Sequence, residues 1–329
     1  MKIATIENIH SIRKHPNADS LALAKVLGYQ VIIGLDSFKE DDKVVFIQPD
    51  TLLPEEPWAE MFRKRSSRVK ACKLRGEWSL GIVMPLYDLV PFEYANQLEV
   101  GDDISEYLGV TKYEPPAPQD LSAAGFLPRG LPKTDEERWQ NISDLPFGEV
   151  CDITLKIDGS SLSVYARKLE DGSWETGVTS RTLRLKTECN NKYMQGVNKY
   201  DMVDKLLSYC QQHDVSLSLR GELYGNGIQG FGKNPHGQLP LNFAAFSVFN
   251  MDKLEYADPS DDHYYEKVCA QLNIPVVPML EKDVVLTPEH IQKYSSEIDK
   301  IDGKPFEGVV VKHAAGSFKI INLQYDERK

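Results

Sequence analysis

The chain has 329 residues, enough for two domains or for one large domain with an extensive core. Its composition, 41% hydrophobic and 26% charged, is ordinary for a globular protein, and its net charge of -11 disfavours an indiscriminate nucleic-acid coat without excluding local basic grooves. The five cysteines are widely spaced and form no Cys-x-x-Cys pair, which disfavours a disulfide framework or a zinc site and indicates a reducing compartment. With no signal peptide or membrane span visible, we expect a cytoplasmic protein.

The first third of the chain is expected to be a small β domain. From residue 1 to about Gly109, short apolar runs recur with turn signals between them, which predicts a sandwich or barrel. A cluster of cations without any acid lies inside this part, flanked by aromatic residues. The cluster fits either a footprint for a phosphate backbone or a solvated loop. The candidates for nucleic-acid binding are Arg63, Lys64, Arg65, Arg68 and Lys70.

Residues 113–130 are rich in proline and poor in apolar periodicity, which indicates a connector between a domain at 1–112 and a second at 131–329. Just after this connector, Thr134 stands three residues before Glu137. This spacing is typical of a capping box, so a helix is expected to begin there.

A short stretch of the second domain, Lys156-Ile157-Asp158-Gly159, lies between two apolar runs that are expected to be strands. Asp-Gly between strands is typical of a hairpin turn, so Lys156 is expected at the mouth of a hairpin. A lysine in this place becomes a nucleophile when nearby cations, a metal or burial lower its pKa. Without them it is an ordinary surface lysine.

The rest of the second domain is expected to alternate strands with two helices, at 201–213 and 288–298. Arg220 and Glu222 fall on one face of an expected strand, because side chains alternate along a strand. Phe246 lies in an apolar strand and is most simply a core residue.

Further charges come from the last strands of the chain. Glu307 and Lys312 stand at the two ends of a β-branched run. They would lie on opposite faces of a regular strand, so they share a site only if the strand twists or bulges. Lys319 lies on the final expected strand. Each charge taken singly suits an exposed strand position.

Together, these charges indicate a cleft for a nucleoside triphosphate. Lysine and arginine neutralise phosphate, carboxylates hold a divalent metal, and an aromatic ring covers a base. The sequence contains neither the Gly-x-x-x-x-Gly-Lys-Ser/Thr loop nor the Gly-x-Gly-x-x-Gly fingerprint, which disfavours a P-loop or Rossmann domain.

The order of these motifs resembles that of the covalent nucleotidyltransferases, the polynucleotide ligases and mRNA capping enzymes. The resemblance covers roughly residues 131–322. Few residues follow the last lysine motif, whereas the small β domain comes first. This domain order resembles the ATP-dependent RNA ligase branch that carries an N-terminal OB-fold domain. The motifs that carry the resemblance are Lys156-Ile157-Asp158-Gly159, Ser180-Arg181, Arg220-Gly221-Glu222-Leu223-Tyr224-Gly225, Phe243-Ala244-Ala245-Phe246, Glu307-Gly308-Val309-Val310-Val311-Lys312 and Phe318-Lys319.

The resemblance implies an α+β fold: an N-terminal OB-type β-barrel followed by a nucleotidyltransferase domain of antiparallel sheets flanked by helices. It implies an enzyme that uses ATP with Mg²⁺ or Mn²⁺ and seals nicked or broken RNA, or an RNA/DNA hybrid, in nick repair. We expect a monomer without membrane association. Carried over residue by residue, the resemblance assigns the AMP-bearing nucleophile to Lys156 and a metal and 3′-hydroxyl role to Asp158. It assigns the substrate phosphate or the terminal nucleotide to Arg181, the ribose to Glu222, adenine to Phe246, the metal shell to Glu307, the α-phosphate to Lys312 and Lys319, and the β/γ-phosphates to Arg138.

The sequence departs from the family pattern at two positions. Relatives often have a second lysine where this chain has Ile321, and an acid where it has Leu155 before the nucleophile. The first departure bears on the α-phosphate contact, and the second on the choice of ATP over GTP. The rival interpretations are a DNA ligase or a capping-type transferase, and a non-catalytic RNA-binding module.

Overall fold

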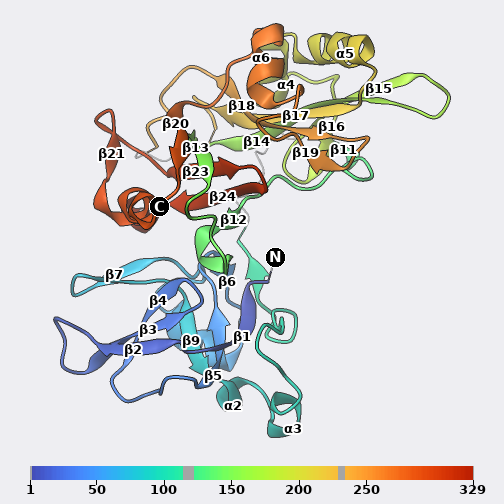
Figure 1. Ribbon diagram of the computed structural model, residues 1–329. Helices are drawn as coiled ribbons and strands as arrows, with labels where there is room; N and C mark the ends of the chain where they lie inside the picture. Colours follow the sequence, from blue (N-terminus) through green and yellow to red (C-terminus); the bar gives the residue numbers. More distant parts are fainter. Residues whose placement is uncertain (1, 114–121, 229–233, 329) are drawn as a thin grey trace. The chain divides into compact units, whose positions relative to one another are not determined.

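The computed structural model describes residues 2–113, 122–228 and 234–328, and the chain divides into two compact units (Figure 1). Unit 1 contains Met1–Pro116, Trp139–Leu145 and Asp326–Lys329, and unit 2 contains Ala117–Arg138 and Pro146–Tyr325. The first prolines of the predicted connector fall within 114–121, outside the described residues. In the described part of the chain, no helix is long and apolar enough to cross a membrane.

Unit 1 is built from short antiparallel strands, because its apolar runs are short and end at turn residues. One sheet has the order β1-β5-β9 and another the order β2-β3-β4. Among the described residues the strand pairs do not close into a barrel, so the expected closed barrel is absent from these ladders. The elements are β1 (Ala4–Asn8), β2 (Ser11–Lys14), β3 (Leu21–Val26), β4 (Tyr29–Gly34), β5 (Lys43–Ile47), β6 (Thr51–Leu52), η1 (Pro57–Ala59), α1 (Glu60–Arg63), β7 (Cys72–Leu74), β8 (Glu77–Ser79), β9 (Ile82–Pro85), α2 (Leu86–Leu89), α3 (Phe92–Ala95), β10 (Thr111–Lys112) and η2 (Trp139–Asn141).

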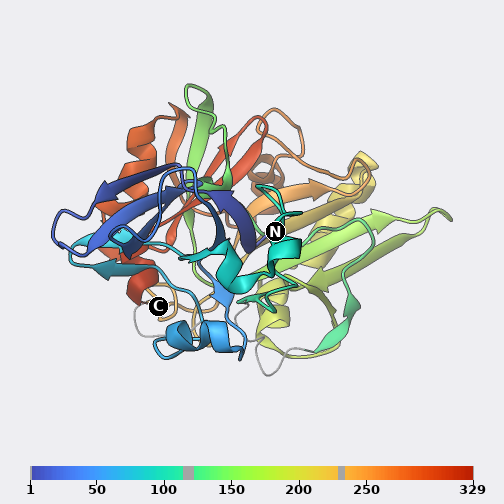
Figure 2. The same ribbon diagram turned by 90° about the horizontal axis from the view of Figure 1, so that it is seen from below.

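Unit 2 contains two larger sheets, which confirms the α+β class with antiparallel sheets and helices. A seven-stranded sheet has the order β11-β16-β15-β14-β17-β18-β19, and a five-stranded sheet the order β12-β24-β23-β13-β20. The β14–β15 hairpin extends from its sheet as a long arm in both views (Figure 1, Figure 2). The strands are β11 (Ala123–Phe126), β12 (Glu137–Arg138), β13 (Val150–Lys156), β14 (Ser160–Lys168), β15 (Trp174–Thr179), β16 (Leu183–Leu185), β17 (Leu217–Tyr224), β18 (Asn242–Asn250), β19 (Glu255–Tyr256), β20 (Met279–Val285), β21 (Lys300–Ile301), β22 (Lys304–Pro305), β23 (Gly308–His313) and β24 (Gly316–Ile321).

The predicted hairpin around Lys156 is wrong. β13 ends at Lys156 and pairs with β20 and β23, whereas β14 begins at Ser160 and pairs with β15 and β17. The chain therefore crosses from one sheet to the other between these residues. Gly159 is required by close packing, because an added Cβ would come within 2.3 Å of the Leu223 carbonyl oxygen. Long-range pairing has overridden the local Asp-Gly turn signal.

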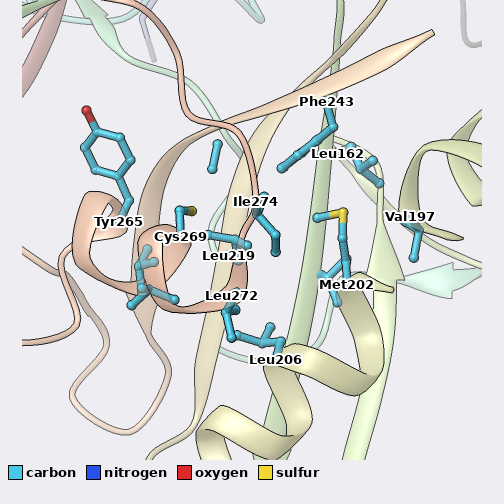
Figure 3. Close-up of a cluster of buried hydrophobic side chains, with 14 of the residues drawn as sticks. Leu162, Val197, Met202, Leu206, Leu219, Phe243, Tyr265, Cys269, Leu272 and Ile274 are labelled. Atoms are coloured by element: carbon cyan, nitrogen blue, oxygen red, sulfur yellow. The ribbon is translucent and has the colours of Figure 1, made fainter. Parts of the chain in front are cut away.

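Helices α4 (Lys192–Lys199), α5 (Met202–His213) and α6 (Tyr265–Leu272) bury their apolar sides in the core of the seven-stranded sheet (Figure 3). In α5 the buried side chains recur at helical spacing: Met202, Leu206, Tyr209 and Cys210. This confirms the helix predicted at 201–213. The helix predicted at 288–298 is also present, as α7 (Pro288–Gln292) continued by the π-helical turn η3 (Lys293–Glu297). The final element is α8 (Leu323–Arg328).

The helix predicted to begin at Thr134 is not formed. The Thr134 hydroxyl bonds to the Ser161 hydroxyl instead of capping a helix. Glu137 and Arg138 form β12, which pairs in parallel with β24. A tertiary contact has thus taken the hydroxyl that a capping box would use, and the Glu137 carboxylate accepts from the backbone N–H of Arg138 instead.

Candidate active site

The end of β13 places Lys156 among carboxylates. Its ammonium donates to Glu307 Oε2 at 2.6 Å, and 28% of its side chain stays exposed, so a ligand can reach the amine. Burial raises the pKa of Glu222 on β17 to about 8; Lys156 opposes the rise, and Glu307, Asp158 and Glu136 add to it. The structure therefore brings the predicted residues Lys156, Asp158, Glu222 and Glu307 into one electrostatic environment, to which the unpredicted Glu136 also belongs.

Glu307 can face this site because it stands just before β23. The alternation of side chains along a regular strand, which would place Glu307 opposite Lys312, applies only within the paired residues Gly308–His313. No twist or bulge in β23 is needed to bring Glu307 to Lys156.

A second group of charges joins Lys319 on β24 to Arg181. Asp135 bridges them, with Oδ1 accepting from Lys319 Nζ at 2.9 Å and Oδ2 accepting from Arg181 at 2.8 Å. Burial lowers the pKa of Lys319; Asp135 raises it, while Arg138 and Lys156 lower it further. Arg138 is buried and stands opposite Lys319 in the parallel β12–β24 pair. Lys319 thus lies close to Arg138 and within the electrostatic influence of Lys156, and Asp135 joins it to Arg181.

Lys312 is buried beside an aromatic ring. Its ammonium lies 3.7 Å from the centroid of the Tyr265 ring and donates to the Phe246 carbonyl. Burial lowers the pKa of Lys312 to about 8, against the attraction of Glu136 and other acids. Glu136 also acts on Glu222, which connects Lys312 electrostatically to the Lys156 environment.

Phe246 occupies a β-bulge, which was not visible in the sequence. Arg220 pairs with Ser247 and Gly221 pairs with Ala245, so Phe246 is the extra residue of β18. A bulge redirects a side chain out of the regular alternation and is common beside active sites. Phe246 is only partly buried, at the margin of the core. The Phe246 ring therefore packs against the core and also keeps an exposed part that a ligand can contact.

Arg220 fixes the segment that carries Asp135 and Glu136. It is 1% exposed, and its guanidinium donates to the Tyr256 hydroxyl and to the Pro132 carbonyl. Together with the Thr134–Ser161 bond, this holds the segment from Pro132 to Arg138 against the seven-stranded sheet of the same unit.

Sequence reasoning missed Asp135 and Glu136 as site residues. Both stand in the segment that was interpreted as a helix start, and acids in the first turn of a helix need no other explanation. The only available signal was the density of charge between the connector and Arg138.

In unit 1, several of the predicted nucleic-acid contacts have partners within the unit. Arg63 donates to Glu55 at 2.8 Å, and Arg68 is paired with Asp50 while its guanidinium lies 4.1 Å from the centroid of the Tyr113 ring. Lys64 lies 3.5 Å from Glu60 at an exposed surface. Two of the flanking aromatic residues, Trp58 and Phe62, pack against the core of the unit. Exposed side chains of the cluster include Arg65 and Lys70.

Comparisons with known proteins show the family of the chain. Residues 150–323 match the family model described as RNA ligase, and residues 3–86 match a model described as an OB-fold domain. The comparison with curated proteins returned no match.

Solved structures of Naegleria gruberi RNA ligase resemble the whole chain. A mutant with AMP and Mn is 28% identical with a TM-score of 0.83, and a mutant with ATP and Mn is 28% identical with a TM-score of 0.84; each match covers 100% of this chain and 99% of the other. The same ligase with PPi is 29% identical with a TM-score of 0.83, over 100% of this chain and 98% of the other. The chain belongs to the RNA ligase family of ATP-dependent enzymes, with an N-terminal OB-fold domain.

Proposed function

We propose that this chain seals 3′-hydroxyl/5′-phosphate breaks in RNA, in nick repair, through a covalent lysyl-AMP intermediate. The observation that carries the proposal is the convergence of the accessible Lys156 amine with Lys319, Arg138, Glu222 and Glu307. We assign residues 1–112 to an OB-fold domain, 113–130 to the connector and 131–329 to the nucleotidyltransferase domain. We also expect the active protein to be a cytoplasmic monomer.

In the first step, the neutral amine of Lys156 attacks the α-phosphorus of ATP, and pyrophosphate leaves. Lys319 and Lys312 neutralise the α-phosphate, Arg138 meets the β/γ-phosphates, and Glu222 accepts from the ribose hydroxyls. Phe246 stacks on adenine from its bulge. Phosphoryl transfer depends mainly on such positioning and charge neutralisation.

In the next two steps, a 5′-phosphate oxygen of RNA attacks the same phosphorus and releases the lysine, and the 3′-hydroxyl then displaces AMP from the adenylylated end. Arg181, which Asp135 joins to Lys319, contacts the RNA phosphate or the terminal nucleotide. Asp158 orients the 3′-hydroxyl.

The residues fit a hard divalent cation such as Mg²⁺ or Mn²⁺. Burial raises the pKa of Glu222 to about 8, and the nearby carboxylates of Glu307 and Asp158 add to the rise; a cation would relieve the repulsion among these acids. No three acidic, cysteine or histidine side chains form a ligand group within the described ranges, so Asp158 and Glu307 would hold the ion with waters and phosphate oxygens. The ion would supply further charge neutralisation at the phosphates.

Intact-mass spectrometry after incubation with ATP or GTP tests the proposal without nucleic acid. The protein should gain the mass of AMP from ATP and no adduct from GTP. A GMP adduct would indicate a capping-type transferase. The absence of an adduct with either nucleotide would favour the interpretation of a non-catalytic RNA-binding module. Sealing of nicked duplexes with RNA or DNA on each side of the break then defines the substrate.

Nucleotide binding should weaken as pH rises through about 8. The pKa of Lys312 is lowered to about 8, so its ammonium is present below that pH and lost above it. A phosphate that needs this charge binds best to the protonated form, and the dissociation constant for ATP should rise between pH 7 and 9. Titration calorimetry of Lys312→Met provides the control: the pH dependence that remains belongs to other groups, among them Glu222. An unchanged pH profile in Lys312→Met would contradict the assignment.

The exposed cations of the unit 1 cluster should contribute to the binding of RNA and not to the attachment of AMP. Arg65→Ala combined with Lys70→Ala should leave AMP attachment unchanged and weaken binding of nicked RNA. The salt dependence of binding should lose about one unit of slope for each phosphate contact removed. Lys14→Ala with Lys39→Ala, two exposed lysines elsewhere in unit 1, is the matched control. Equal losses in both double variants would point to net charge rather than a local footprint.

A further inference from the structure

The last helix reaches the turn that carries Asp158. Tyr325 on α8 is 4% exposed, and its hydroxyl donates to Asp158 Oδ2 at 2.8 Å. Asp158 itself is 6% exposed. A carboxylate otherwise rotates easily about its terminal torsion, which has broad, roughly two-fold preferences. The phenol therefore selects one orientation of this carboxylate.

Asn322, just before Tyr325, contacts the backbone at Glu307, the other acid that is predicted to bind the metal. Asn322 is fully buried; its backbone N–H donates to the Glu307 carbonyl at 2.9 Å, and its side-chain amide donates to the Phe306 carbonyl at 3.1 Å. The Asn322 side chain also accepts from the backbone of Gln324, which fixes the start of α8. A single short segment thus contacts the Asp158 side chain and the backbone at Glu307.

The turn at Asp158 is also fixed from the opposite side. The Asn234 side-chain amide donates to the Asp158 carbonyl at 2.9 Å in a buried position. Gly159 packs directly on the Leu223 carbonyl. Since the backbone is held by these contacts, the Tyr325 hydroxyl acts on the orientation of the carboxylate rather than on the fold of the turn.

We propose that Tyr325 is a positioning residue for RNA sealing, acting through Asp158. This inference rests on the proposed function. The hydroxyl occupies Oδ2 and so directs the rest of the carboxylate toward the ion and the 3′-hydroxyl. Partners that orient a metal-site carboxylate typically contribute roughly 10- to 100-fold in affinity or activity.

The test compares full-length wild type with Tyr325→Phe, which removes only the hydroxyl. Single-turnover sealing of a pre-adenylylated RNA nick should slow by roughly 10- to 100-fold. The affinity for Mn²⁺, measured from the paramagnetic resonance signal of the free ion, should fall as well. If Tyr325 acts through Asp158, the double variant Asp158→Asn/Tyr325→Phe should seal no more slowly than Asp158→Asn alone.

Tyr294→Phe is the matched control, because Tyr294 is a buried tyrosine that donates to the Glu281 carboxylate outside the candidate site. Wild-type rates and Mn²⁺ affinity in Tyr325→Phe, additive losses in the double variant, or equal losses in Tyr294→Phe would each overturn the inference. If the wild-type protein neither gains AMP nor seals RNA, the proposed function itself fails, which is a different result.

Discussion

Lys156→Ala should abolish covalent attachment of AMP and lower the overall rate of sealing from ATP by at least about a thousandfold, because the substitution removes the amine that forms the intermediate. The amine of Lys156 is accessible, and Glu307 holds it at the end of β13. Intact mass after incubation with ATP and Mg²⁺ measures the first effect, and a gel assay of a nicked RNA measures the second. Binding of ATP should persist, because the phosphate-binding cations remain.

The control for this experiment is Lys168→Ala. Lys168 ends β14 and pairs with Asp214 at 2.8 Å, with 46% of its side chain exposed. Its removal should leave AMP attachment unchanged, since an exposed ion pair contributes at most about 1 kcal/mol to stability. AMP attachment to Lys156→Ala at the wild-type rate would place the nucleophile elsewhere and refute the assignment. A variant that seals pre-adenylylated RNA while failing with ATP would locate the defect in the first step.

The set of charged residues could be predicted because each member follows from a local pattern. Strand periodicity placed Arg220 and Glu222 on one face of a strand, and the ordered motifs identified Lys156 as the candidate nucleophile. Burial is the main cause of the raised pKa of Glu222, and Lys156 and Glu307 both act on this carboxyl as well. What a motif supplies is residue type and order along the chain.

The arrangement of the sheets was beyond the reach of local patterns. Asp-Gly after Lys156 predicted a hairpin, but β13 pairs with β23, about 150 residues further along the chain by register. Asp135 and Tyr325 contact the site through side chains from segments that carry no motif. The bulge at Phe246 likewise depends on the pairing of β17 with β18. Such features are set by tertiary packing, which a single sequence does not display.

Lys319→Met should slow AMP attachment by about 100- to 1000-fold, the range expected when one preorganised charge donor is removed from a transition state. The Lys319 side chain is largely buried, close to Arg138, and interacts electrostatically with Lys156. Burial disfavours its charged form, and Asp135 partly offsets this effect. A cation kept under such desolvation is most effective when an anion arrives, because the phosphate then meets a charge that water does not screen. Methionine keeps the length of the side chain and removes this charge, so unfolding temperature should change little while the reaction slows.

The matched control for Lys319→Met is Lys293→Met, which breaks an ion pair of the same geometry, 2.8 Å to Glu281, away from the candidate site. If Lys319 acts on the transition state, Lys319→Met should lower the maximal rate of AMP attachment more than it raises the ATP concentration needed for half of that rate. Lys319→Arg should restore only part of the rate, because the planar guanidinium differs in shape from an ammonium that is held by Asp135. Equal effects of Lys319→Met and Lys293→Met would show that Lys319 only forms a structural ion pair.

Lys319→Met should also slow the transfer of AMP to the RNA 5′-phosphate, because Asp135 joins Lys319 to Arg181. Such a second defect would indicate that the Asp135 carboxylate couples the cation at the nucleotide phosphate to the cation at the RNA.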